Sequence, residues 1–234
     1  MLVLRRRQVV WGLVFAIAGI AVGSALQYGS GLETFKYGKQ NQFSVVVDAG
    51  HGSPDGGTVG VNGTVEQKIN LAIAKKLQEV LVGKGIHVIM TREGDEGLQG
   101  EHTGSIRQMK REDMNQRLEI MKKSKADLFI SIHMNSFESE KVRGLRLFYD
   151  KGHPEMKELA EIMQEKMGAV TGAEIKAVKT ADNRLFLMKD PPLPSILAEC
   201  GFLSNPEEEK KLNDQEYQAR LAWAIADAIE KYFA

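Results

Sequence analysis

Two histidines and two glutamates, His51, Glu66, His133 and Glu199, are the residues of this 234-residue chain whose types could act together in one reaction. Two histidines and a carboxylate, with a fourth position left open for water, form a ligand set typical of a catalytic zinc ion. A second carboxylate beside such an ion can take up a proton and return it to a leaving group. The spacing differs from the compact H-E-x-x-H motif of a single helix, so the fold must bring the four side chains together.

Three of these residues stand where a buried strand is predicted to end. Each follows a run of mostly apolar residues: 45–47 precede His51, 128–132 precede His133 and 196–198 precede Glu199. Glu66 is expected in the first turn of a helix that begins at the same edge of the sheet. Because the carboxyl ends of parallel strands meet at one edge, we expect all four side chains to converge there.

Each residue taken alone also fits a structural role. A glutamate in the first turn of a helix, as expected for Glu66, interacts favourably with the helix dipole. A strand-end histidine such as His133 is often a core residue with satisfied hydrogen bonds. Glu199 is harder to explain in this way, because a carboxylate that follows three apolar residues is costly to bury without a partner. The convergence of all four favours a catalytic site.

The rest of the pattern predicts a single α/β domain over residues 43–234. A strand, a helix with Thr64 and Gln67 in capping-box positions, and a second strand over 87–92 form a unit typical of a parallel sheet. Residues 93–110 are polar and glycine-containing and are predicted to form a long loop. The remaining expected elements are a helix through 114–121, strands over 127–133 and 143–149, a helix over 154–167, a short strand over 185–188, a strand over 195–201, a helix after Asn205 and a C-terminal helix.

The first 42 residues have a different composition. Arg5–Arg7 precede an uncharged apolar run over 9–26, which fits both a cleaved signal peptide and an uncleaved membrane anchor. Residues 27–42 are polar, as in a linker. We therefore expect a segment 1–26 that directs export, a linker 27–42, and an exported domain 43–234 that is secreted or anchored in the membrane through residues 9–26.

Composition limits the other function classes. The formal net charge is zero, so no bulk electrostatic attraction to nucleic acid is expected. Cys200 is the only cysteine, so an exported domain would contain no internal disulfide and must be stabilised by its core.

Three stretches resemble the signatures of zinc-dependent N-acetylmuramoyl-L-alanine amidases of the amidase_3 type. They are DAGHG at 48–52 with Glu66 downstream, SIHMNS at 131–136 and AECGFLSNPEE at 198–208. The three motifs occur in the order that the family has. The resemblance implies a mostly parallel twisted sheet of about six strands flanked by helices, one zinc ion held by His51, Glu66 and His133, and Glu199 as the catalytic acid and base.

The resemblance also implies a reaction and a substrate. The family hydrolyses the amide bond between N-acetylmuramic acid and L-alanine of the stem peptide in peptidoglycan. The size and the N-terminal apolar segment are most similar to members that act in sporulation and germination, where the substrate is spore cortex and the reaction leads towards muramic lactam. This implies action outside the cytoplasm, on the forespore or cortex side in a spore former. The sequence leaves open whether an accessory protein retains the zinc or docks the substrate.

Two further residues are candidate substrate-binding groups. Asn135 follows a proposed zinc ligand and could support the site through hydrogen bonds. Arg92 could hold a substrate carboxylate through two parallel hydrogen bonds, and a surface arginine without a role is the alternative. Asp48 and Asp55, near His51, are interpreted as residues that shape the loop.

Two other functions fit the same residues. A non-catalytic peptidoglycan-binding or scaffold protein could keep zinc for stability, although structural zinc sites usually have four protein ligands and Glu199 would have no role in a binder. A zinc carboxypeptidase that cuts within the stem peptide would use the same ligand set, and its products would distinguish it from an amidase.

Overall fold

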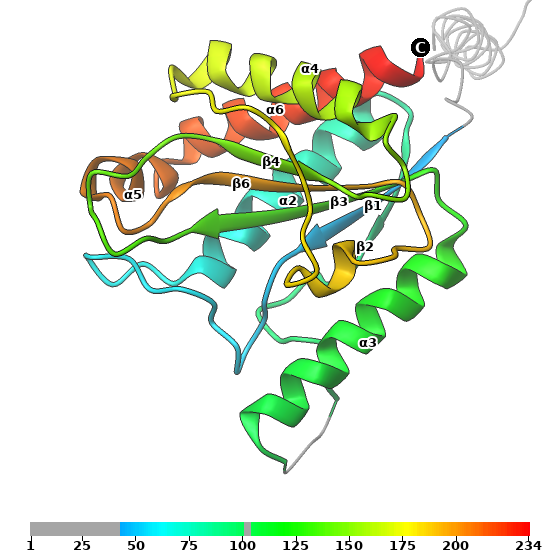
Figure 1. Cartoon of the computed structure of the whole chain (residues 1–234), viewed down its shortest axis with the longest axis horizontal. Coiled ribbons are helices and arrows are strands. Elements are labelled where there is room, and N and C mark those ends of the chain that lie inside the picture. The colour runs from blue at the N-terminus through cyan, green and yellow to red at the C-terminus, as the bar shows by residue number, and fades with distance from the viewer. Residues whose placement is uncertain (1–42, 101–103) are drawn as a thin grey trace, which may run out of the picture. The chain divides into compact units, whose positions relative to one another are not determined.

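The computed structural model describes residues 43–100 and 104–234 (Figure 1). The predicted signal or anchor segment at 1–26 and the predicted linker at 27–42 lie outside the described residues. Within the described ranges, no helix is both long enough and apolar enough to cross a membrane.

A six-stranded sheet forms the centre of the domain, in the order β2-β1-β3-β6-β4-β5. The strands are β1 (Ser44–Ala49), β2 (His87–Met90), β3 (Leu128–Asn135), β4 (Arg146–Tyr149), β5 (Lys179–Thr180) and β6 (Ser195–Phe202). Strands β2, β1, β3 and β6 run parallel, whereas β4 pairs antiparallel with β6. The predicted α/β fold with a mostly parallel sheet is therefore confirmed. The carboxyl ends of β1, β3 and β6 are neighbours at one edge.

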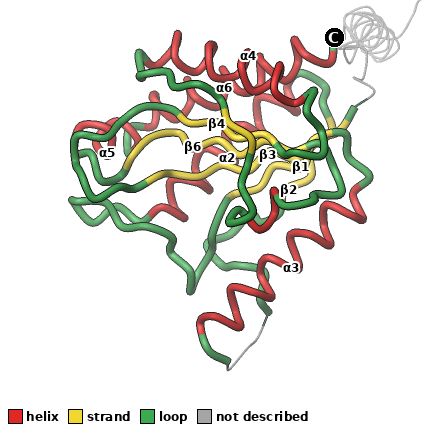
Figure 2. Tube along the Cα trace, in the orientation of Figure 1, coloured by secondary structure: helices red, strands yellow, loops and turns green. Residues whose placement is uncertain are grey.

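Helices pack on both sides of this sheet (Figures 1 and 2). The α-helices of the described residues are α2 (Glu66–Gly83), α3 (Ile106–Ser124), α4 (Met156–Thr171), α5 (Pro206–Leu212) and α6 (Gln215–Phe233), and a 3-10 helix, η2, spans Phe186–Met188. Asn205 caps α5 through hydrogen bonds to the N–H groups of Glu207 and Glu208, as its sequence position before a proline predicts.

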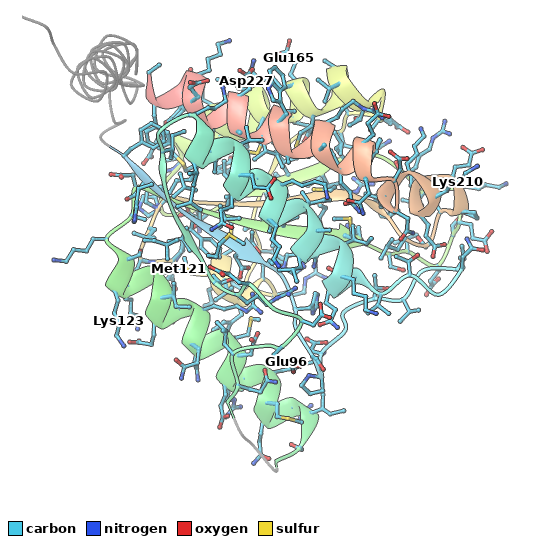
Figure 3. All side chains as sticks on the ribbon, turned by 180° about the vertical axis from the view of Figure 1, so that it is seen from behind. Glu96, Met121, Lys123, Glu165, Lys210 and Asp227 are labelled. Atoms are coloured by element: carbon cyan, nitrogen blue, oxygen red, sulfur yellow. The ribbon has the colours of Figure 1, made fainter. Side chains whose placement is uncertain are left out.

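The two faces of the sheet are covered unequally. Val45 and Val47 of β1 belong to the main core, which α2, α4 and α6 complete. Val46 points to the opposite face, where it joins a smaller cluster with Met121 of α3 and Leu187 of η2. Met121 points from α3 towards the sheet, whereas Lys123 points to solvent (Figure 3). The face under α3 and η2 therefore has room for a cleft.

Helix α2 does not use the predicted capping box. Val65 takes the N-cap position, and no side chain caps the helix there. The backbone N–H of Thr64 donates to the Glu209 carboxylate (3.1 Å), and the Thr64 hydroxyl accepts from the Asn213 amide (2.7 Å). Contacts with α5 thus occupy Thr64, and the predicted cap is wrong.

Two other local predictions are also wrong. The loop predicted over 93–110 ends earlier, because α3 begins at Ile106 behind a capping box formed by Ser105 and Gln108. Few apolar residues precede Met114, so hydrophobic periodicity does not reveal the first turns of this helix. The predicted strand at 185–188 contains the 3-10 helix η2 instead, because a short apolar run does not distinguish a strand from a helical turn.

Candidate active site

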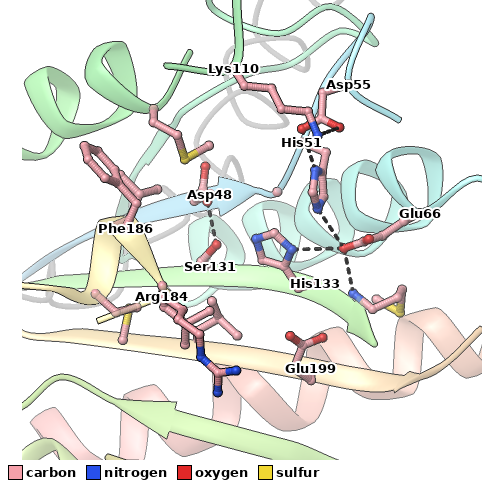
Figure 4. A pocket seen from close by; sticks show the side chains of 17 residues that line it. Asp48, His51, Asp55, Glu66, Lys110, Ser131, His133, Arg184, Phe186 and Glu199 are labelled. Atoms are coloured by element: carbon pink, nitrogen blue, oxygen red, sulfur yellow. Dashed lines mark hydrogen bonds and ion pairs between the residues drawn. The ribbon is translucent and has the colours of Figure 1, made fainter. Parts of the chain in front are cut away.

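A cleft of about 410 Å³ opens on the face of the sheet that α3 and η2 cover (Figure 4). His51, Glu66, His133 and Glu199 all line this cleft. They come from the loop after β1, the first turn of α2, the end of β3 and the end of β6. The structure therefore brings together the four side chains that the sequence predicts to converge.

Strand alternation explains why these side chains share one face. Ile130 and Ile132 of β3 point into the main core, so Ser131 and His133 point to the opposite face. His133 is paired in register with Glu199 on β6. The strand that carries His133 thus also sets the position of Glu199.

Three of the side chains form a compact donor cluster. Oε1 of Glu66 lies 2.9 Å from Nδ1 of His133 and 3.3 Å from Nε2 of His51. One ligand atom from each residue lies within 4.8 Å of the other two. Figure 4 shows both rings turned towards this oxygen.

The geometry and chemistry of this cluster fit a zinc ion. Ligand atoms on a tetrahedral zinc, with bonds of about 2.0–2.1 Å, are separated by about 3.3 Å. The separations around Glu66 Oε1 are close to this value, and two imidazoles with one carboxylate leave a fourth position free. The residues that the sequence predicts as zinc ligands therefore suit that ion.

Backbone and amide donors fix the Glu66 carboxylate. Oε2 accepts a hydrogen bond from the N–H of Thr58 (2.9 Å), and Oε1 accepts from the N–H of Met134 (3.1 Å) and the amide of Asn70 (3.2 Å). Burial alone would raise the pKa of Glu66, but its hydrogen bonds with His133 and His51 lower the pKa below its ordinary value. Glu66 is thus a carboxylate in the folded protein.

Asp55 orients the ring of His51. Its Oδ2 lies 2.9 Å from Nδ1 of His51, and its Oδ1 lies 2.8 Å from Nζ of Lys110 on α3. Burial lowers the pKa of His51, but hydrogen bonds to Asp55 and Glu66 outweigh it and raise the pKa to about 9. With Nδ1 held by Asp55, Nε2 of His51 faces the cluster, as in the carboxylate–histidine pairs that support metal ligands.

Glu199 differs from the other carboxylates of the cleft. Its Oε2 is buried and has no hydrogen-bond partner among the described residues. Burial raises the pKa of Glu199 to about 7, although the nearby His133 acts in the opposite direction. A carboxyl group with a pKa near neutrality suits general acid and base catalysis.

The floor of the cleft holds one more carboxylate, that of the fully buried Asp48. Asp48 accepts hydrogen bonds from the hydroxyls of Ser131 (2.5 Å) and Thr91 (2.7 Å) and forms an ion pair with Arg117. Because these donors occupy both of its oxygens, Asp48 acts as a structural anchor of the floor.

The two candidate substrate-binding residues are placed elsewhere. Arg92 is buried, and its guanidinium donates to the carbonyl groups of Ala49, Gly50 and His51, with further bonds to Gly94 and Gln67. Neither a carboxylate-binding role nor a surface position fits this environment. Asn135 does not line the cleft, and its side-chain oxygen accepts from the N–H of Ser136 (2.8 Å).

Sequence reasoning missed two supporting residues of the site. The interpretation of Asp55 as a loop-shaping residue overlooks its contact with His51, which the H-x-x-x-D spacing could have suggested. Lys110 lies in the segment predicted as a loop, so its place on α3 was not predictable from periodicity. The remaining cleft wall is largely apolar, formed by Met114 of α3 and by residues 185–188 around η2.

Comparison with known proteins identifies the family. Residues 45–231 match the family model of N-acetylmuramoyl-L-alanine amidase. The germination-specific N-acetylmuramoyl-L-alanine amidase of Bacillus subtilis is 35% identical over 189 residues, which cover 81% of this chain and 79% of that protein.

Solved structures agree with this match. The CwlD amidase from Clostridioides difficile, solved in complex with the GerS lipoprotein, is 42% identical with a TM-score of 0.77, and the match covers 81% of this chain and 98% of that one. The catalytic domain of CwlV from Bacillus (Paenibacillus) polymyxa is 31% identical with a TM-score of 0.70, over 81% of this chain and 97% of that one. This chain therefore belongs to the N-acetylmuramoyl-L-alanine amidase family and is related to its germination-specific member.

Proposed function

We propose that this chain is a zinc-dependent hydrolase that cleaves the amide bond between N-acetylmuramic acid and L-alanine of the stem peptide in peptidoglycan. The observation that carries the proposal is the donor cluster of His51, Glu66 and His133 beside Glu199, whose Oε2 is buried and unpartnered among the described residues. Family membership supports the choice of substrate.

His51, Glu66 and His133 would hold one zinc ion per chain. When bound, the ion supplies Lewis acidity, which makes water more acidic and polarises a carbonyl group. The protein contributes the fixed directions of the donors: Asp55 orients His51, and the N–H groups of Thr58 and Met134 orient Glu66.

Glu199 acts first as general base and then as general acid. Its carboxylate accepts a proton from the attacking water, whose oxygen bonds to the carbonyl carbon of the lactyl group. As the carbon–nitrogen bond breaks, Glu199 returns the proton to the nitrogen of L-alanine. A pKa of about 7 suits both transfers.

Spore cortex is the proposed natural form of the substrate. The relationship to a germination-specific amidase supports this choice. Action outside the cytoplasm follows from the substrate, with residues 1–26 as the proposed export signal or anchor. The complex of the related CwlD amidase with a lipoprotein supports the further proposal that an accessory protein binds this chain.

Product analysis tests the proposed reaction. The full chain, with zinc in excess, is incubated with purified peptidoglycan, and new amino termini and released fragments are identified. An amidase frees peptides that begin with L-alanine and leaves the muramic acid intact.

Other products would overturn the proposal. A carboxypeptidase shortens the stem peptide from its other end and creates no new N-terminal alanine. A scaffold protein would sediment with peptidoglycan and release nothing. Glu199→Gln is the matched control, because any product that it forms at the wild-type rate comes from a contaminating enzyme or from a mechanism without Glu199.

A further inference from the structure

His51 has an unusual backbone conformation. Its φ is 62°, in the left-handed region that residues other than glycine rarely adopt. Such conformations persist where surrounding contacts hold them. In this conformation the ring of His51 faces Glu66, so whatever holds the backbone of His51 also holds a candidate zinc ligand in place.

Two arginine side chains bind the backbone at this point. Arg117 of α3 donates to the carbonyl oxygens of His51 (2.6 Å) and Ala49 (2.9 Å). Arg92 donates to the same two oxygens, at 2.7 and 2.9 Å, and to the carbonyl of Gly50 (3.1 Å). Three successive carbonyl groups thus accept from two planar guanidinium groups.

Both guanidinium groups are buried, Arg92 against backbone carbonyl groups and Arg117 against carbonyl groups and two carboxylates. Arg117 is 0% and Arg92 is 4% exposed. Arg117 forms ion pairs with Asp48 of β1 and with Asp113, one turn earlier on α3. Burying an arginine is costly unless it is paired and hydrogen-bonded. Each nitrogen of the Arg117 guanidinium has an acceptor, either on Asp113 or at the end of β1 and the start of the loop that carries His51.

Helix α3 also supports the side chain of His51, through Asp55. Lys110 lies against Asp55, and Asp55 holds Nδ1 of the His51 ring. Two of the three buried residues of α3, Asp113 and Arg117, are charged, while Met121 packs in the smaller apolar cluster. Two separate contacts of α3 thus support one candidate metal ligand.

We propose that Arg117 is a positioning residue for the metal centre: through the carbonyl groups of Ala49 and His51 it keeps His51 in the conformation that presents Nε2 to zinc. The inference rests on the proposed zinc site and adds helix α3 to the elements that form it. Arg92 holds the same carbonyl groups from the side of β2.

A purely structural role for Arg117 makes a different prediction. In that case the loss of Arg117 would destabilise the fold, but the folded protein would bind zinc as before. The metal affinity of the folded state therefore separates the two roles.

Arg117→Lys in the full chain tests the proposal. Lysine keeps the charge but lacks the planar fork that reaches two carbonyl groups and two carboxylates together. Zinc affinity is measured by chelator competition at a temperature where circular dichroism shows a folded chain, and the visible spectrum of the cobalt-loaded protein reports ligand geometry. We expect zinc to bind about 10- to 100-fold more weakly than in wild type, the range found for residues that orient metal ligands, and the cobalt spectrum to change.

The matched control is Arg111→Lys, an exposed arginine on the same helix, which should leave affinity and spectrum unchanged. If Arg117→Lys does not fold, the triple variant Asp48→Asn/Asp113→Asn/Arg117→Met replaces it, because it removes Arg117 together with both of its carboxylate partners and leaves none of them as an uncompensated buried charge.

A folded variant with wild-type zinc affinity and an unchanged cobalt spectrum would overturn the proposal. The test does not depend on turnover. If wild type binds zinc but releases no peptide, the proposed reaction fails while the role of Arg117 is still measured. If wild type binds no zinc, both proposals are overturned.

Discussion

Glu199 sits in register with His133 on the neighbouring strand, yet its Oε2 accepts no hydrogen bond from the described residues. An unsatisfied buried carboxylate destabilises a protein, and such groups concentrate at functional sites. Asp48, whose two oxygens both have partners, differs from Glu199 in this respect, and the difference supports Glu199 as the proposed catalytic carboxylate.

Glu199→Gln should therefore bind one zinc ion and lose turnover. Glutamine keeps the shape of the side chain but cannot accept and return a proton, so we expect peptide release to fall about 10²- to 10⁴-fold. Zinc content by elemental analysis and peptide release from peptidoglycan are measured on the same preparation. A variant that keeps most of its activity would show that another group transfers the proton.

A substitution at Gly50 tests how closely the backbone packs against His133, a proposed zinc ligand. A Cβ added there would lie 2.3 Å from Cε1 and Nε2 of His133. Gly50→Ala should displace this ring, weaken zinc binding and lower the free energy of unfolding by about 1–3 kcal/mol, as overpacking does.

Gly83→Ala is the control for this substitution. Among the described residues, a Cβ at the last residue of α2 meets nothing within 4 Å. This variant should therefore bind zinc normally, and its free energy of unfolding should rise by about 0.4–1 kcal/mol. Equal zinc affinity in both variants, measured by chelator competition, would contradict the observed packing of His133.

Residues such as Lys110 and Arg117 mark the limit of what the sequence predicts at this scale. The four cleft residues were predictable because alternation and strand ends follow from local pattern. The contacts of Lys110 with Asp55 and of Arg117 with the backbone of His51 form only when α3 docks against the loop after β1. No local pattern encodes that docking.

At the level of elements, the ion pair between Asp48 of β1 and Arg117 of α3 connects the sheet to the helix that contacts the loop carrying His51. Burial would raise the pKa of Asp48, but the charge of Arg117 and the hydroxyl of Ser131 lower this pKa below its ordinary value. A carboxyl group whose pKa is lowered by folding contributes stability above its unfolded pKa, and this contribution is lost as the pH falls towards its folded pKa.

The stability of the metal-free chain should therefore depend on pH through Asp48. We expect Asp48→Asn to lower the free energy of unfolding by about 3 kcal/mol at pH 7. The difference from wild type should shrink as the pH falls from about 5 to about 2. Urea unfolding of both proteins with a chelator present measures this difference. A difference in the free energy of unfolding that stays constant over this pH range would rule out the assigned role of Asp48.

The element predictions failed where tertiary contacts outweigh local signals. Thr64 has the sequence of a helix cap, but Glu209 and Asn213 bind it instead. The start of α3 was missed because its first turns carry mostly polar residues, although Ser105 and Gln108 contain the signal of a capping box.

For the whole molecule, the unequal cover of the sheet links fold to function. Helices α2, α4 and α6 bury one face in the main core, while α3 and η2 form only a small cluster on the other. The cleft occupies the part of this face nearest the carboxyl ends of β1, β3 and β6. The apolar runs of these strands predicted the sheet, whereas the cleft depends on how α3 and η2 pack against it.

Stepwise return of zinc to the metal-free chain tests the catalytic metal centre most directly. Peptide release with N-terminal alanine is recorded after each addition of zinc to the chelator-treated protein. We expect activity to be absent without metal, to rise linearly to one zinc per chain and then to stay constant. Full activity without zinc, or a rise that continues to two or more ions per chain, would contradict a single site formed by His51, Glu66 and His133.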